Sequence, residues 1–134
     1  MSTSQNELNR LLEFAAEVAR EAGEITLRYF KRDFIAERKA DNSYVTIADR
    51  EAEGLLRRRI ESTFPEDGIL GEEEGEKTGS SGRRWIIDPI DGTYSFVHGV
   101  PLYAVLIGLE IEPKRNIASA DASFPNDRVN EFSR

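Results

Sequence analysis

The chain has 134 residues, enough for one domain with a core of its own, and it carries 18 Lys and Arg against 25 Asp and Glu, a formal net charge of −7. This acidic balance argues against a general binder of nucleic acid or of membrane surfaces, because phosphate backbones and anionic lipids attract basic surfaces. Without cysteine there can be no disulfide, thiol nucleophile or thiolate zinc site. The N-terminus lacks a signal-peptide pattern and no apolar run is long enough to span a bilayer, so we expect a soluble, cytoplasmic protein.

Two amphipathic helices are predicted in the first half of the chain. From about Ser4 to Phe30, apolar residues recur every three or four positions. Ser4 and Glu7 have capping-box spacing at the start of this helix. A second helix is predicted from about Thr46 to Phe64, where a turn that contains proline and glycine stops it.

Five strands are predicted around and after these helices, from short apolar or alternating segments. They cover residues 34–39, 68–71, 85–88, 103–111 and 118–124. The stretch 75–84 is rich in Gly, Ser, Lys and Glu, which predicts an exposed, mobile loop. Helices gathered beside a sheet make the predicted fold α+β.

The main candidate site is a run of six residues that offers oxygen ligands and backbone N–H groups: Asp88, Pro89, Ile90, Asp91, Gly92 and Thr93. A strand that ends at Asp88 delivers a carboxylate to the sheet edge, and Pro89 fixes the next turn. Asp91 can then return to the same side, with the Ile90 carbonyl between the two acids, and such hard oxygens suit Mg²⁺. A short helix beginning at Gly92 and Thr93 would present N–H groups to an anion. Taken alone, the run is also explained by Asp91 capping a helix and Asp88 being solvated at a strand end.

Three other residues bear on this site. Glu72 follows a predicted strand as Asp88 does, so a sheet could bring both acids to one edge, although acidic loops are often simply solvated. Asp49 has capping-box spacing with Thr46, and capping alone would explain it. His98 could act as a base, but a surface or hydrogen-bonded histidine is the simpler interpretation.

Three stretches, in this order and spacing, resemble the signatures of the inositol monophosphatase family: Asp41 to Asp49, Gly71 to Glu73, and Trp85 to Thr93. The resemblance runs from the first helix to about Ile111, and more weakly through Phe124 and Pro125.

Within the family, residues 39–43 and 93–103 look most like the histidinol-phosphatase branch. Inositol phosphatases more often carry Thr-Asn where this chain has Tyr94-Ser95. The resemblance implies two N-terminal helices packed on a mainly antiparallel sheet. It also implies a Mg²⁺-dependent phosphomonoesterase that converts L-histidinol phosphate to L-histidinol by metal-activated water. The alternative substrate is inositol 1-phosphate or a related sugar phosphate.

The resemblance assigns metal ligands position by position. Glu72, Asp88 and the carbonyl of Ile90 would hold a first Mg²⁺, and Asp88 and Asp91 would contribute to a second. Two cations can stabilise both the attacking and the leaving oxygen in phosphate-ester hydrolysis.

The resemblance also assigns the catalytic and substrate-binding residues. Asp49 and the Thr93 hydroxyl would orient and deprotonate the attacking water, assisted by Glu72. The substrate phosphate would be bound by Glu72, Asp91, Gly92, Thr93 and Tyr94.

The chain departs from the family in the region after these motifs. Family members have a second half that covers the site and supplies a metal-binding Asp in a Trp-Asp motif, whereas the one tryptophan here, Trp85, is followed by Ile86. We therefore expect residues 1–134 to form a single domain, the N-terminal metal- and phosphate-binding half, with the C-terminal half absent. An exposed apolar sheet face would favour a homo-oligomer. The expected partner is a small phosphorylated substrate, with no nucleic acid and no membrane. The alternative from another functional class is a non-catalytic, truncated fragment with a scaffold or binding role.

Overall fold

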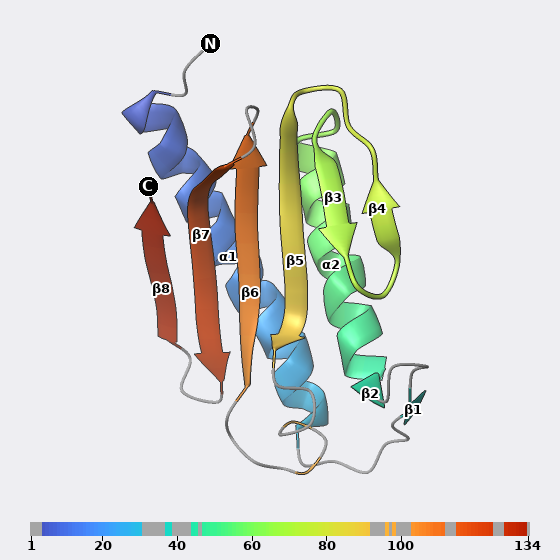
Figure 1. Cartoon of the computed structure of the whole chain (residues 1–134). Coiled ribbons are helices and arrows are strands. Elements are labelled where there is room, and N and C mark those ends of the chain that lie inside the picture. The colour runs from blue at the N-terminus through green and yellow to red at the C-terminus, as the bar shows by residue number, and fades with distance from the viewer. Residues whose placement is uncertain are drawn as a thin grey trace.

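The computed structural model describes residues 4–30, 37–38, 44–45, 47–91, 96, 98, 103–111, 115–124 and 128–133. These residues form the helices α1 (Gln5–Tyr29) and α2 (Ile47–Thr63) and the strands β1 (Glu37–Arg38), β2 (Tyr44–Val45), β3 (Gly68–Gly71), β4 (Gly75–Lys77), β5 (Arg83–Asp91), β6 (Tyr103–Ile111), β7 (Arg115–Phe124) and β8 (Arg128–Ser133). Six strands form one sheet in the order β4-β3-β5-β6-β7-β8, and β1 pairs with β2 separately. Both helices lie on the same face of the six-stranded sheet (Figure 1).

Both predicted helices are confirmed to within a residue or two at each end. The Ser4 hydroxyl accepts a hydrogen bond from the Glu7 backbone N–H at 3.1 Å, which is the capping contact that the spacing predicts. The buried positions of α1 follow its apolar stripe and include Leu11, Ala15 and Val18. No helix in the described part of the chain has both the length and the apolar character needed to cross a membrane.

The sheet is mainly antiparallel, and the predicted α+β fold is confirmed. Antiparallel pairing joins β5 to β6, β6 to β7, β7 to β8 and β3 to β4. Among the strand pairs that the structure describes, only β3 and β5 run parallel, with Gly71 opposite Ile87. This pairing makes the chain leave both strands at the same end of the sheet.

One expectation about the candidate site is wrong: the strand does not end at Asp88. β5 continues to Asp91, and its pairing with β6 shifts register between Asp88 and Asp91. Pro89 lies inside this irregularity, where its missing N–H removes no regular ladder bond. This irregularity within the strand, rather than a turn after it, separates the two acids.

Three other segments extend or correct the predicted strands. The stretch 75–84 is not all loop, because β4 occupies its first three residues and pairs with β3 at the sheet edge. β8 follows the predicted 118–124 strand, which lies within β7, and was not expected. Of the predicted 34–39 strand only β1 lies within the described residues.

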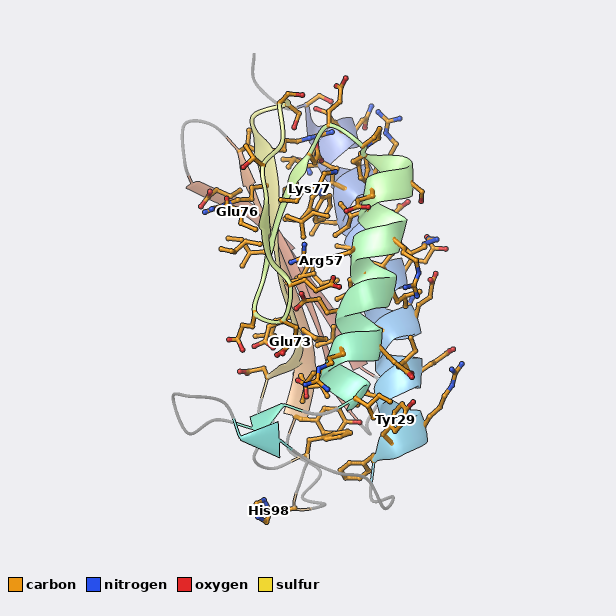
Figure 2. All side chains as sticks on the ribbon, turned by 90° about the vertical axis from the view of Figure 1, so that its right-hand side faces the viewer. Tyr29, Arg57, Glu73, Glu76, Lys77 and His98 are labelled. Carbon is orange, nitrogen blue, oxygen red and sulfur yellow. The ribbon has the colours of Figure 1, made fainter. Side chains whose placement is uncertain are left out.

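The core lies between the helices and the sheet. In β5 and β6 alternate side chains face it, among them Trp85, Ile87, Val105 and Ile107. An edge-on view shows both helices on one side of the strands (Figure 2). The side chain of Ile86, which alternates with these buried positions, is 39% exposed.

A buried acid, Asp67, anchors the end of the sheet where β3 and β5 begin. Its carboxylate is 1% exposed and accepts hydrogen bonds from the Trp85 indole N–H at 2.9 Å and the Ser81 hydroxyl at 2.6 Å. The Arg83 guanidinium donates a third at 3.2 Å. Close packing accompanies these bonds, since a Cβ on Gly79 would lie 2.3 Å from the Gly68 nitrogen. Asp67 therefore links the turn after α2 to the loop that leads into β5.

We predict that Asp67→Ala lowers the free energy of unfolding by about 2–4 kcal/mol, because it leaves the buried indole N–H and the guanidinium without their acceptor. Urea denaturation followed by Trp85 fluorescence measures this. The control is Glu66→Ala, which removes an exposed carboxylate next to Asp67 and should change stability by less than about 0.5 kcal/mol. Equal stability of the two variants would contradict this account of Asp67.

Candidate functional site

The parallel pairing of β3 with β5 brings Glu72 close to Asp88. Gly71 lies opposite Ile87, so the next residue of each strand emerges at the same level of the sheet. In Figure 1 this is the lower end of the sheet, where the arrows of β3 and β5 point and α2 begins. This register agrees with the expectation that a sheet would bring Glu72 and Asp88 to one edge.

Asp88 is the focus of the local charge. Its pKa is raised from 3.8 to about 6, chiefly by partial burial and then by the negative charges of Glu72, Asp91 and, more weakly, Asp49. A hydrogen bond with the Ile90 backbone opposes these effects, since it favours the charged carboxylate. Three acids, from α2, the β3–β4 turn and the end of β5, therefore act on Asp88 at this end of the sheet.

Asp49 approaches from the helical layer. It lies in the first turn of α2 and is 3% exposed, where a helix N-terminus favours a negative charge. Its predicted capping partner, Thr46, lies outside the described residues. The Tyr29 hydroxyl at the end of α1 donates a 2.7 Å hydrogen bond to Glu51, which raises the pKa of the tyrosine and ties the two helices together beside Asp49.

Of the remaining predicted residues, some are described by the structure and others are not. Ile90 is buried in β5, and Asp91 is exposed at the end of that strand. Gly92, Thr93 and Tyr94 lie outside the described residues. The side chain of His98 is exposed, and Figure 2 shows it at the lower extremity of the molecule.

The donor set suits a hard divalent cation. Carboxylates together with a backbone carbonyl are the ligands that Mg²⁺ and Ca²⁺ prefer. Part of the rise in the Asp88 pKa, after that due to burial, comes from neighbouring negative charges that a cation would neutralise. Within the described ranges, no three acidic or histidine side chains are gathered tightly enough to form a ligand shell. Like charges at this edge repel one another, so their closer approach depends on a positive counter-charge.

Sequence reasoning missed two charged residues of α2, Glu53 and Arg57. With Asp49 they are spaced by four, so they form a line beside the apolar stripe of the helix, and all three are buried. The four-residue spacing of these charged residues was visible in the sequence. Surface helices usually expose charged side chains to water, so the spacing alone did not show whether these side chains were buried or exposed.

The fold and site define a class, an α+β protein with acidic side chains gathered at one end of a mainly antiparallel sheet. Residues 7–128 match the model of the "Inositol monophosphatase family". The chain therefore belongs to the inositol monophosphatase family.

Individual relatives agree with this assignment. The chain is 55% identical over 102 residues to a histidinol-phosphatase of Chlorobaculum parvum, covering 75% of this chain and 39% of the relative. It is 43% identical over 114 residues to a histidinol-phosphatase of Mycobacterium tuberculosis, covering 83% and 44%. The crystal structure of the extragenic suppressor protein suhB from Bartonella henselae superimposes with a TM-score of 0.88 at 31% identity, covering 93% and 49%. The chain thus spans less than half the length of these relatives.

The raised pKa of Asp88 predicts a pH-dependent gain in stability for Asp88→Asn in the absence of metal. A carboxyl that binds its proton more tightly when folded stabilises the fold below its unfolded-state pKa, and this contribution is lost as the pH rises through about 6. The full shift corresponds to about 3 kcal/mol, which solvent screening of a partly exposed group reduces to about 1–2 kcal/mol.

Urea denaturation in EDTA at pH 4.5 and pH 8 measures this effect. Asp88→Asn should be more stable than the wild type at pH 8 and similar to it at pH 4.5. Glu76→Gln, an exposed change on the edge strand β4, serves as the control and should show no such difference (Figure 2). A variant that is less stable than the wild type at pH 8 would contradict the predicted repulsion.

Proposed function

We propose that this chain is the metal- and phosphate-binding part of a Mg²⁺-dependent phosphomonoesterase that hydrolyses L-histidinol phosphate to L-histidinol. One observation carries the proposal: the charges of Glu72, Asp91 and Asp49 converge on Asp88 at the end of a parallel strand pair. Two relatives named histidinol-phosphatase, at 55% and 43% identity, support this choice of substrate. Residues 1–134 would act as a single domain in this role.

The metal-binding residues would be those that the family resemblance assigns. Glu72, Asp88 and the Ile90 carbonyl would hold one Mg²⁺, and Asp88 with Asp91 would contribute to a second. Bound Mg²⁺ would supply Lewis-acid stabilisation of the phosphate oxygens and lower the pKa of a bound water. The bulge in β5 supports this role, since it separates Asp88 from Asp91 by two residues while the strand stays in the sheet.

The protein's own groups would position the substrate and the attacking water. Gly92, Thr93 and Tyr94 would bind the phosphate alongside Glu72 and Asp91. Asp49 and the Thr93 hydroxyl would orient the water and take its proton. The burial of Asp49 supports its role, because a carboxylate held in the first turn of a packed helix has few accessible orientations.

The test is phosphate release from histidinol phosphate and from inositol 1-phosphate, each with and without Mg²⁺. We expect Mg²⁺-dependent release, faster with histidinol phosphate, and a loss of about 100-fold or more in Asp88→Asn. Glu76→Gln should keep the wild-type rate. Faster release from inositol 1-phosphate would favour the alternative substrate, as the name of the family suggests.

The same experiment tests the alternative that the chain is non-catalytic. A chain that is folded by circular dichroism but releases no phosphate from either ester would contradict turnover by these residues alone. It would favour a non-catalytic scaffold or binding role, which is compatible with the chain spanning 39% and 44% of the two curated relatives.

We also propose that this chain self-associates through the sheet face opposite the helices. Ile86 is 39% exposed on β5, and its partners across the sheet are Leu70, which is partly exposed, and Gly108. Leu106, which lies two residues before Gly108 on β6, pairs with Asp88 and is also partly exposed. Apolar side chains gathered on an open sheet face favour association.

We predict that light scattering coupled to size exclusion shows an oligomer for the wild type and a smaller species for Ile86→Lys, because a lysine on this face opposes its burial. Ile47→Lys is the matched control, since Ile47 is similarly exposed (44%) but lies on α2. A monodisperse wild-type monomer would contradict the proposal.

A further inference from the structure

Glu53 is a fully buried carboxylate on α2 whose partners lie in the turn that carries Glu72. The backbone N–H of Glu73 donates to its Oε1 at 3.2 Å, and the backbone N–H of Glu74 donates to its Oε2 at 2.9 Å. These donors belong to residues 20 and 21 positions further along the chain. A helix side chain therefore satisfies the backbone of the β3–β4 turn.

Arg57, one helical turn after Glu53, contacts the other side of the same turn. Its Nε donates to Glu53 Oε2 at 3.1 Å and lies 3.2 Å from Glu74 Oε2. Its Nη2 donates to the backbone carbonyl of Gly75. Figure 2 shows Arg57 between α2 and the strands. Together the two side chains bind two N–H groups and one carbonyl of this turn.

Gly71 fits the same arrangement from the strand side. A Cβ at this position would lie 2.7–2.8 Å from the carboxylate atoms of Glu53, closer than such atoms can approach. The side chain of Glu53 thus occupies the space that a larger residue at position 71 would need. Glu72 is therefore flanked by two contacts of Glu53, at Gly71 before it and at the Glu73 N–H after it.

We propose that Glu53, supported by Arg57, is a positioning residue that fixes the backbone of Glu72 for metal binding. The inference rests on the proposed function, since it assigns Glu72 as a ligand. A buried carboxylate is costly unless its hydrogen bonds are complete, so the turn is stable only in the conformation that presents its N–H groups. That conformation fixes the position of the Glu72 backbone, from which its carboxylate extends. Hydrogen bonds around a metal ligand orient the ligand in the same way.

The test compares Glu53→Gln with the wild type by two measurements. An amide side chain keeps the size of the carboxylate but replaces one acceptor oxygen with an N–H donor, so one of the three bonds is lost. We expect hydrogen exchange at the Glu73 and Glu74 amides, measured by NMR without metal, to become at least about tenfold faster. We expect the Mg²⁺ dissociation constant from titration calorimetry to rise by about 10- to 100-fold.

Two further variants separate positioning from general destabilisation. Gly71→Ala displaces the Glu53 carboxylate without altering its chemistry and should reproduce both effects. Asp67→Asn changes an equally buried acid with three donors at the other end of the sheet, and should leave both measurements at their wild-type values. An Asp67→Asn variant that weakens Mg²⁺ binding as much as Glu53→Gln would overturn the inference.

The exchange measurement also distinguishes this inference from the proposed function. A wild type that binds no Mg²⁺ would reject the proposed function, while exchange at Glu73 and Glu74 would still show whether Glu53 holds the turn. Unchanged exchange in both Glu53→Gln and Gly71→Ala would overturn the inference whatever the metal affinity of the wild type.

Discussion

The parallel pairing of β3 with β5 is the constraint on which the site depends. It makes Gly71 and Ile87 neighbours, so the residues that follow them, Glu72 and Asp88, lie at the same level of the sheet. An antiparallel pairing of the same two strands would send these acids to opposite ends of the sheet. The parallel arrangement requires the chain to return to the other end between the two strands, and the return is made through β4 and the loop that Asp67 anchors. The return loop is therefore held by hydrogen bonds of its own, at the end of the sheet opposite the acids.

Placing Asp88 in a partly buried position among other acids opposes folding, as its raised pKa shows. The fold tolerates the repulsion because its stability comes from elsewhere, chiefly from the apolar layer between the helices and the sheet. Such a conflict between local stability and charge is characteristic of functional sites. The burial of Asp49 in the same field adds to it, since burial removes the water that would otherwise screen the charge.

The elements that the sequence predicts well are those with local causes. The stripe of α1 and the apolar runs of β3 and β6 depend on periodicity within a few residues, and the structure confirms them. β4 and β8 were missed because each is a short polar segment that becomes a strand only by pairing with its neighbour. The predicted turn after Asp88 was wrong because pairing with β6 extends the strand through Pro89. The order of the acidic motifs identified the candidate site, but the roles of Glu53 and Asp67 depend on partners 14 to 21 residues away.

Two buried carboxylates perform the same structural task at opposite ends of the sheet. β3 has four residues and β4 has three, too few for their ladders alone to determine the loops beside them. Asp67 fixes the loop before β5 through side-chain donors, so that loop depends on the identities of Ser81, Arg83 and Trp85. Glu53 instead accepts the backbone N–H groups of residues 73 and 74, and this holds the turn in place whatever side chains it carries. The backbone geometry of the turn next to Asp88 is thus determined from α2.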